Sequence, residues 1–254
     1  MIHQKPFVLS GGGVRGFAHL GVIKALQEVG ISPSEISGTS AGAIIGAFLA
    51  DGFTPDEIKE LFLTKLNLNV FSINTFRYGL ISMHKIRDLV EKNLRHMFFE
   101  QLSMPLYVSA TNFIDGRQHI FHEGPMIDAI IASCSIPVLF SPMMINGIPY
   151  VDGGLSNNLP VEPFIQQKNQ IVSIYVNPLK VYNADDSMLA MIDRSVHLGF
   201  REMVNRSAHG CYLSIEPDNL TEFGLFEIDK LTAIVDAGYA YTANFLQHHD
   251  ALKS

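Results

Sequence analysis

Residues 36–45 constrain this chain more than any other stretch. A short apolar run ends in Gly38-Thr39-Ser40-Ala41-Gly42, and small and apolar residues of helical character follow at once. This order is typical of a nucleophile elbow, in which a strand turns sharply into a helix with one serine at the apex. Gly38 and Gly42 are expected because a Cβ at either flank would collide with the neighbouring backbone. The stretch predicts Ser40 as a nucleophile, although a glycine-rich helix start with Thr39 or Ser40 as the N-cap would have the same residues.

A second glycine-rich segment precedes the elbow. Residues 7–9 predict a buried strand, residues 11–16 a Gly-Gly-Gly-Val-Arg-Gly loop, and the next apolar residues a helix. The loop satisfies the G-x-G-x-x-G pattern of a dinucleotide site, but the serine turn occupies the place of the required acidic residue. A P-loop would need Gly-Lys-Ser/Thr, which is absent. Because loops after neighbouring parallel strands lie side by side, an oxyanion hole beside Ser40 is the best interpretation.

Asp152 is the second residue with predicted chemistry. It follows an apolar strand and precedes Gly153 and Gly154, a sequence that suits a tight loop at a sheet edge. An Asx-turn is the structural alternative, because Asp-Gly pairs often form one. Beyond it, Asn157 and Asn158 are expected to supply supporting hydrogen bonds.

A serine nucleophile needs a base, and a histidine is the first alternative to Asp152. In the Ser–Asp–His order of α/β-hydrolases the base would be one of four late histidines, His197, His209, His248 or His249. That fold places several strands before its nucleophile, whereas only 39 residues precede Ser40. The four histidines also fall within or at the ends of predicted helices. The short stretch of chain before Ser40 and the helical placement of the four histidines therefore argue against the triad.

Composition limits the other classes of function. The chain has 254 residues and a net charge of −7, and its basic residues are scattered, which argues against a nucleic-acid partner. Cys134 and Cys211 are expected to be two buried thiols in a reducing compartment. Residues 1–10 show no signal-peptide core, and the apolar stretch 126–145 is interrupted by polar residues and prolines. We expect a cytoplasmic protein, with peripheral contact to a membrane left open.

Three motifs, in this order and at these separations, resemble those of the patatin-like phospholipase family. They are residues 11–16, 38–42 and 152–154, and residues 132–137 (Ala-Ser-Cys-Ser-Ile-Pro) resemble a further family segment. The resemblance covers about residues 5–175, and residues 176–254 match only in their pattern of elements. It implies an α/β fold of three α/β/α layers with a mainly parallel central sheet, formed by residues 1–254 as a single domain.

The resemblance also implies a mechanism. Ser40 would be the nucleophile and Asp152 the base of a dyad without histidine, with oxyanion N–H groups from Gly11, Gly12 and Gly13 and with Arg15 assisting. The reaction would be hydrolysis of a carboxylic ester of a lipid or lysolipid through an acyl-enzyme, with no cofactor and no metal. The alternative is a noncatalytic lipid- or protein-binding regulatory protein on the same fold. Such a protein would need no intact dyad, whereas every motif residue is present here.

The rest of the chain predicts alternating elements. Thr54, Pro55 and Glu57 indicate a helix start with a capping box. Residues 66–82 are apolar without a regular period, and they predict either a loop packed on the core or a lid over an acyl-chain site. Helices are further predicted at 83–95, 126–133, 188–209 and 229–248, and strands at 106–112, 119–121, 140–144, 148–151, 171–176 and 211–215, with turns at 115–116 and 146–147.

Overall fold

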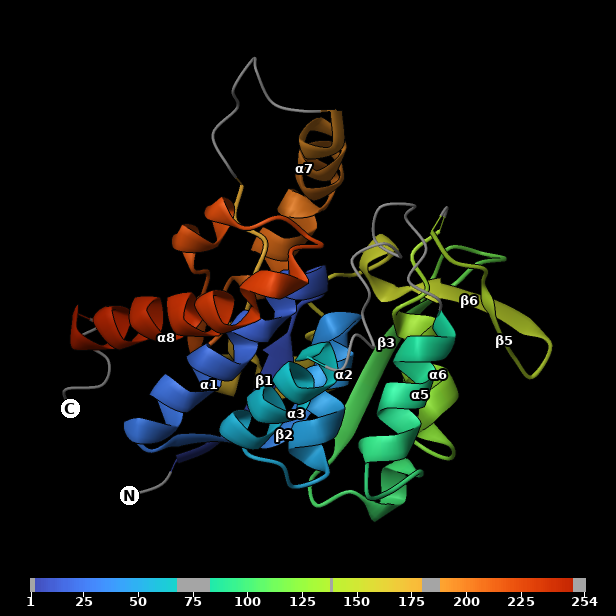
Figure 1. Ribbon diagram of the computed structural model, residues 1–254, viewed down its shortest axis with the longest axis horizontal. Helices are drawn as coiled ribbons and strands as arrows, with labels where there is room; N and C mark the ends of the chain where they lie inside the picture. Colours follow the sequence, from blue (N-terminus) through green and yellow to red (C-terminus); the bar gives the residue numbers. More distant parts are fainter. Residues whose placement is uncertain (1–2, 68–82, 138, 180–187, 249–254) are drawn as a thin grey trace.

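The computed structural model describes residues 3–67, 83–137, 139–179 and 188–248. These residues form an eight-stranded sheet covered by helices (Figure 1). The strands are β1 (His3–Leu9), β2 (Ile31–Thr39), β3 (Leu106–Asn112), β4 (Gln118–Phe121), β5 (Met143–Ile145), β6 (Ile148–Asp152), β7 (Val172–Ile174) and β8 (Leu213–Ile215). The α-helices are α1 (Ala18–Glu28), α2 (Ala41–Ala50), α3 (Pro55–Asn67), α5 (Met83–Asn93), α6 (Met126–Ser133), α7 (Met188–Ala208) and α8 (Leu231–His248).

The sheet is mainly parallel, as predicted. Strands β3, β2, β1, β7 and β8 lie side by side in that order, and each neighbouring pair is parallel. Strands β4 and β6 pair antiparallel with β3, and β5 forms a hairpin with β6. Asn146, at φ 51°, and Gly147 make the predicted turn of that hairpin. The parallel part fixes one edge where the strands end, and this is where α/β proteins place their sites.

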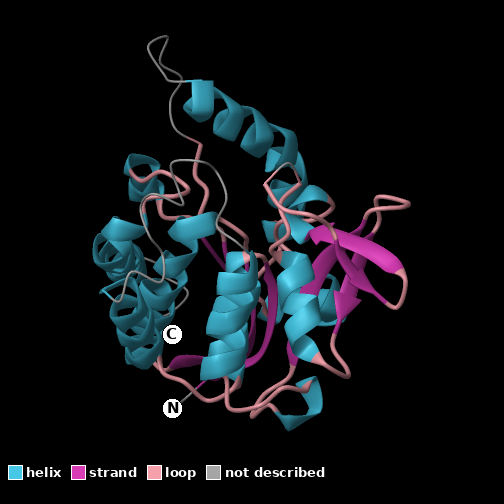
Figure 2. Cartoon of the chain, turned by 45° about the vertical axis from the view of Figure 1, so that its right-hand side comes forward, coloured by secondary structure: helices cyan, strands magenta, loops and turns pink. Residues whose placement is uncertain are grey.

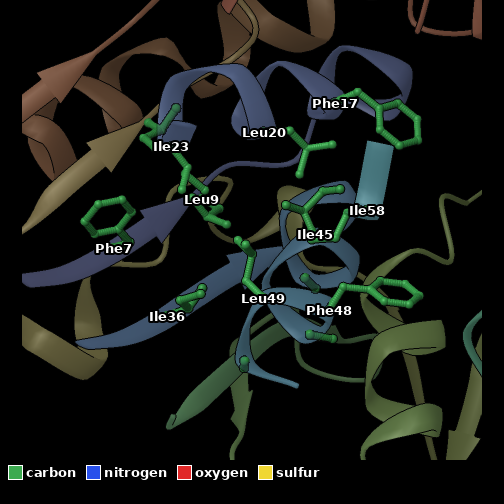
Figure 3. Close-up of a cluster of buried hydrophobic side chains, with 14 of the residues drawn as sticks. Phe7, Leu9, Phe17, Leu20, Ile23, Ile36, Ile45, Phe48, Leu49 and Ile58 are labelled. Atoms are coloured by element: carbon green, nitrogen blue, oxygen red, sulfur yellow. The ribbon is translucent and has the colours of Figure 1, made fainter. Parts of the chain in front are cut away.

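Side chains alternate between two cores on the two faces of the sheet. Phe7 and Leu9 of β1 enter the larger core, which α1, α2, α3, α5, α6 and α8 cover (Figure 3). Val8 points to the opposite face, where it packs with Phe164 and with Val204 of α7. These six helices lie on one face and α7 lies on the other; Figure 1 shows α1 beside α8, and α5 beside α6. Helices therefore cover both faces, and the three-layer α/β/α architecture is confirmed (Figure 2).

The predicted elements are present, with small differences at their ends. The capping box at α3 forms as expected, since the Glu57 N–H donates to Thr54 Oγ1 (3.2 Å) and the Thr54 N–H donates to Glu57 Oε2 (2.8 Å). Strand β1 begins at His3, earlier than residue 7, because it continues to pair with β2. Residues 66–82, predicted to form either a loop packed on the core or a lid, lie almost entirely outside the described residues. Within the part of the chain that is described, no helix is both long and apolar enough to cross a membrane.

Candidate active site

Strand β3 brings Ser40 and Asp152 together. Its pairing with β4 overlaps both its pairing with β2 and its pairing with β6, so β2 and β6 must share the other edge of β3. On that edge Thr39 is the partner of Ser109, and Asp152 is the partner of the next residue, Ala110. Strand β2 thus ends where β6, running in the opposite direction, also ends. The two predicted catalytic residues therefore come from strand ends that meet on one edge.

Ser40 has the backbone of a nucleophile elbow. It is the single residue between β2 and α2, and its φ of 52° and ψ of −120° lie in a region that residues with a side chain rarely adopt. A Cβ on Gly38 would lie 2.5 Å from the Gly42 carbonyl oxygen, and a Cβ on Gly42 would collide with the Leu9 carbonyl oxygen. Both glycines are required by close backbone approach, as the sequence suggests. The turn also directs the N-terminus of α2 toward the serine, which favours negative charge there.

Ser133 holds the elbow in this conformation. Its hydroxyl accepts the Ser40 N–H (2.8 Å) and donates to the Ser109 carbonyl oxygen (2.6 Å). Ser133 is fully buried at the end of α6. Without it the buried Ser40 N–H would lose its acceptor, so Ser133 positions the nucleophile. The sequence marked its segment but gave Ser133 no role.

Asp152 is buried beside the nucleophile. One carboxylate oxygen accepts the Gly154 N–H (2.8 Å), and the Ser40 hydroxyl is a further hydrogen-bond partner. Burial raises the pKa of Asp152 to about 6, although these two hydrogen bonds partly oppose the rise. A Cβ on Gly153 would collide with the Ser109 carbonyl oxygen, so glycine is needed where the chain passes over β3. At neutral pH this carboxylate is a stronger base than an ordinary aspartate and still mostly ionised.

The glycine loop lies against the elbow. A Cβ built on Gly11 would be 3.1 Å from the Cβ of Ser40. Two buried asparagines hold the Gly11 backbone from both sides: Asn158 Oδ1 accepts its N–H (2.8 Å), and Asn177 Nδ2 donates to its carbonyl oxygen (2.6 Å). Asn158 was anticipated as a supporting residue. Asn177 was not, because it reaches the loop from the end of β7, 166 residues away.

These contacts narrow the set of oxyanion donors. The N–H of Gly11 is used by Asn158, and the N–H of Val14 donates to the Leu225 carbonyl oxygen (2.9 Å). Among the described residues, the N–H groups of Gly12 and Gly13 donate to no protein acceptor. Gly13 has a φ of 55°, a conformation that favours glycine. Of the three glycines expected to supply N–H groups, Gly12 and Gly13 therefore have an N–H that can bind an oxyanion, whereas the N–H of Gly11 is already used.

Arg15 has a structural contact in this arrangement. Its side chain is buried, and Nε donates to the Phe223 carbonyl oxygen (2.7 Å). The charge of Arg15 also lowers the pKa of Glu227, after the Gly224 backbone N–H and the Lys230 side chain. Arg15 thus ties the glycine loop to residues 223–227.

An apolar pocket of about 140 Å³ opens beside Ser40. Its described lining comes from the glycine loop, from α2, α3 and α5, from three residues that follow α6 and from three residues that precede α8. Its described lining residues include no charged side chain; apart from Ser40 they are Gly13, Val14, Gly16, Phe17, Ala41, Ile44, Ile45, Phe62, Ile86, Leu89, Cys134, Ile136, Phe140, Leu225, Phe226 and Ile228. Such a pocket suits a hydrocarbon chain whose carbonyl group lies at the serine.

Cys134 also borders the site, but its chemistry excludes it as the nucleophile. The thiol is buried, and burial, together with the nearby Asp152 charge, raises its pKa well above the ordinary value, while a hydrogen bond with Ser40 opposes the rise. A protonated, buried thiol is a poor nucleophile. Cys134 is buried as predicted, whereas Cys211 is partly exposed, contrary to the expectation of two buried thiols. The reason is that Cys211 follows the end of α7 at the protein surface.

No described histidine lines the pocket. His197 is buried in α7, and His248 Nδ1 contacts the carbonyl oxygen of Asn244 in its own helix; His249 lies outside the described residues. His19 is structural: it is fully buried, its Nε2 donates to the Ser10 carbonyl oxygen (2.9 Å), and burial lowers its pKa to about 4. The described residues also include no group of three potential metal-ligating side chains.

A second hollow, of about 290 Å³, is not part of this site. It lies around the start of β3, where Pro105, Leu106 and Tyr107 line it together with His122. These residues lie at the amino end of β3, whereas Ser40 and the glycine loop follow the carboxyl ends of β2 and β1. Although the second hollow is larger, none of its lining residues belongs to the predicted site.

Comparisons with known proteins show which family the chain resembles. The family model described as patatin-like phospholipase matches residues 7–165. An uncharacterized NTE family protein of Mycobacterium tuberculosis is 34% identical over 158 residues, which are 61% of this chain and 44% of that protein. Lysophospholipase NTE1 of Kluyveromyces lactis is 27% identical over 280 residues, covering 95% of this chain and 19% of that protein. The chain thus spans less than half the length of these relatives.

The fold has a counterpart among solved structures. The crystal structure of VipD from Legionella pneumophila superimposes with a TM-score of 0.52 and 16% sequence identity. The match covers 96% of this chain and 67% of VipD. At this identity the likeness concerns the fold alone.

Proposed function

The chain belongs to the patatin-like phospholipase family, and from this we propose that it is a serine acyl hydrolase that cleaves the carboxylic ester of a lipid or lysolipid. The observation that carries the proposal is the contact between Ser40 and Asp152. A strained serine at a strand–helix turn shares a hydrogen bond with a buried carboxylate whose pKa is raised to about 6. An apolar pocket opens at the same serine.

The proposed reaction has two stages. In the first, Asp152 takes the proton of the Ser40 hydroxyl while Oγ attacks the ester carbonyl, and the proton then passes to the leaving alcohol. In the second, Asp152 takes a proton from water, which attacks the acyl-enzyme, and the proton returns to Ser40 as the carboxylic acid leaves. Gly12 and Gly13 donate their N–H groups to the oxyanion in both stages. No cofactor and no metal enter this scheme.

The remaining motif residues have supporting roles in the proposal. Ser133 fixes the backbone of the nucleophile, and Asn158 and Asn177 fix the glycine loop from opposite sides. Residues 223–228 hold the same loop through Val14 and Arg15, so we treat residues 1–254 as one domain rather than a catalytic core with an independent tail. A noncatalytic binding protein would not need these contacts, which fix the nucleophile and the glycine loop.

The test is hydrolysis by the purified wild-type protein and by Ser40→Ala. Two substrates are used, p-nitrophenyl butyrate and lysophosphatidylcholine, with circular dichroism to confirm that both proteins are folded. We expect the variant to lose at least about a thousandfold in kcat, as removal of a nucleophile does in serine hydrolases. Ser135→Ala is the matched control, because its buried hydroxyl donates to the Ile131 carbonyl oxygen and not to the elbow (2.8 Å). Equal activity of wild type and Ser40→Ala would refute the proposal.

A further inference from the structure

We infer that Phe62 closes the far end of the acyl pocket, so that this protein prefers esters of short acyl chains, with about six carbons. The inference rests on the proposed function, because it takes the pocket beside Ser40 as the acyl site. It goes further by assigning a chain-length limit to one residue.

The floor of the pocket is one face of α2. Ala41, Ile44 and Ile45 line the pocket at positions i, i+3 and i+4 from the start of the helix. Phe48, at i+7, continues the same face but is fully buried and does not line the pocket. Ile45 and Phe48 are labelled in Figure 3. A chain that starts at Ser40 and follows α2 therefore runs along the helix until the level of Phe48.

Phe62 of α3 covers that end. Its ring packs edge-on against Phe48, with centroids 5.8 Å apart, and against Phe17, with centroids 4.8 Å apart. Phe17 and Phe62 both line the pocket, while Phe48 lies behind Phe62. Phe53 continues the cluster, with its ring centroid 5.4 Å from that of Phe48. Packed rings thus line this part of the pocket, and the ring of Phe62 contacts both the pocket and Phe48, which does not line it.

The size of the pocket sets the length of the chain. Its volume is about 140 Å³. An apolar protein cavity of roughly 150 Å³ stays dry and binds benzene, a molecule of six carbons. The pocket therefore has room for about six carbons before a chain meets Phe62. Longer chains must bend out of the pocket or displace packed rings, and each methylene that stays in water forgoes its burial free energy.

Substitutions at the closing end and on the floor of the pocket should move the limit in opposite directions. Phe62→Leu shortens the closing side chain without deleting it, and we expect the preferred acyl chain to lengthen by about one carbon. Ile44→Phe enlarges a partly exposed side chain on the floor, so the preferred chain should become shorter. Phe164→Leu is the control, because Phe164 is an equally buried phenylalanine in the core on the other face of the sheet.

The first readout is kcat/KM for p-nitrophenyl esters from acetate to dodecanoate. We expect the wild-type profile to peak near hexanoate, the Phe62→Leu profile to move to longer chains and the Ile44→Phe profile to shorter ones. The Phe164→Leu profile should keep its peak. Identical profiles in wild type, Phe62→Leu and Ile44→Phe would overturn the inference while leaving the hydrolase proposal intact.

The second readout needs no turnover. Binding of primary alcohols from butanol to dodecanol is measured by calorimetry to Ser40→Ala and to Ser40→Ala/Phe62→Leu. Affinity should rise about fourfold per methylene up to about six carbons and then level off, with a later plateau in the double variant. A steady rise to dodecanol in both proteins would overturn the inference. Because alcohol binding is measured without turnover, failure of the proposed function and failure of the chain-length limit give different results.

Discussion

Replacing Asp152 by Asn should abolish turnover and at the same time stabilise the protein above pH 7. The wild-type carboxylate is buried, and it must be ionised to act as a base. Burial of this charge therefore lowers the free energy of unfolding, and a neutral amide at the same position avoids that loss. Asn has nearly the same shape, and its Oδ1 can still accept the Gly154 N–H that Asp152 accepts now.

The size of the effect follows from the pKa of Asp152. Burial raises it from 3.8 to about 6, and each unit corresponds to about 1.4 kcal/mol. The unfolded chain loses its proton at lower pH than the folded protein does, so the contribution of this group to stability falls as pH rises from about 4 through 6. The full penalty, about 3 kcal/mol, applies above pH 7, and roughly half of it applies at pH 5.

The assay is urea unfolding of wild type and Asp152→Asn at pH 5 and pH 8, followed by circular dichroism. We expect the variant to be more stable at both values, and its advantage to be larger at pH 8 by about 1.5 kcal/mol. Asp128→Asn is the control, since Asp128 forms a partly exposed ion pair with Arg87 that should contribute about 1 kcal/mol or less at either pH. An advantage that does not grow with pH, or a variant that keeps its activity, would refute the reasoning.

Further predictions concern the supports of the site. The pH profile of kcat/KM should rise with a pKa near 6, the value that burial gives to Asp152, and should not shift in His197→Gln; a limb that moves in that variant would indicate a histidine base. Ser133→Ala should lower kcat about ten- to a hundredfold, because the buried Ser40 N–H loses its acceptor, and steady-state kinetics in which Ser135→Ala loses as much would contradict this. Asn158→Ala should lower kcat more than it raises KM, since the glycine loop loses its anchor; an effect on KM alone would count against that role. Ser40→Gly should be more stable to thermal unfolding than Ser40→Ala by about 1 kcal/mol or more, because glycine relieves the strained backbone, and equal stability would show that no strain is stored there.

The sequence predicted the features that depend on neighbouring residues. The elbow, the glycine loop and the capping box each occupy a few consecutive residues whose conformations are limited by their own side chains, and helices and strands follow from the local apolar period. The family resemblance then paired Ser40 with Asp152. Composition and spacing alone left an Asx-turn as a strong alternative for Asp152.

The supports of the site could not be predicted in this way. Asn177 contacts Gly11 across 166 residues, and the Leu225 carbonyl oxygen accepts the N–H of Val14 from the other end of the chain. No local pattern encodes such contacts, because they depend on β7 pairing beside β1 and on α8 packing against α1. The same holds for the pocket, whose closing residue Phe62 reads in sequence as an ordinary apolar position of a helix.

The central claim is that Ser40 is a nucleophile activated by Asp152. Its most direct test is intact-mass spectrometry after incubation with a short alkyl fluorophosphonate, followed by peptide mapping. The account predicts a single adduct on Ser40 in the wild-type protein, no adduct in Ser40→Ala and much slower labelling in Asp152→Asn. An adduct on another residue, or equal labelling of wild type and Ser40→Ala, would contradict it.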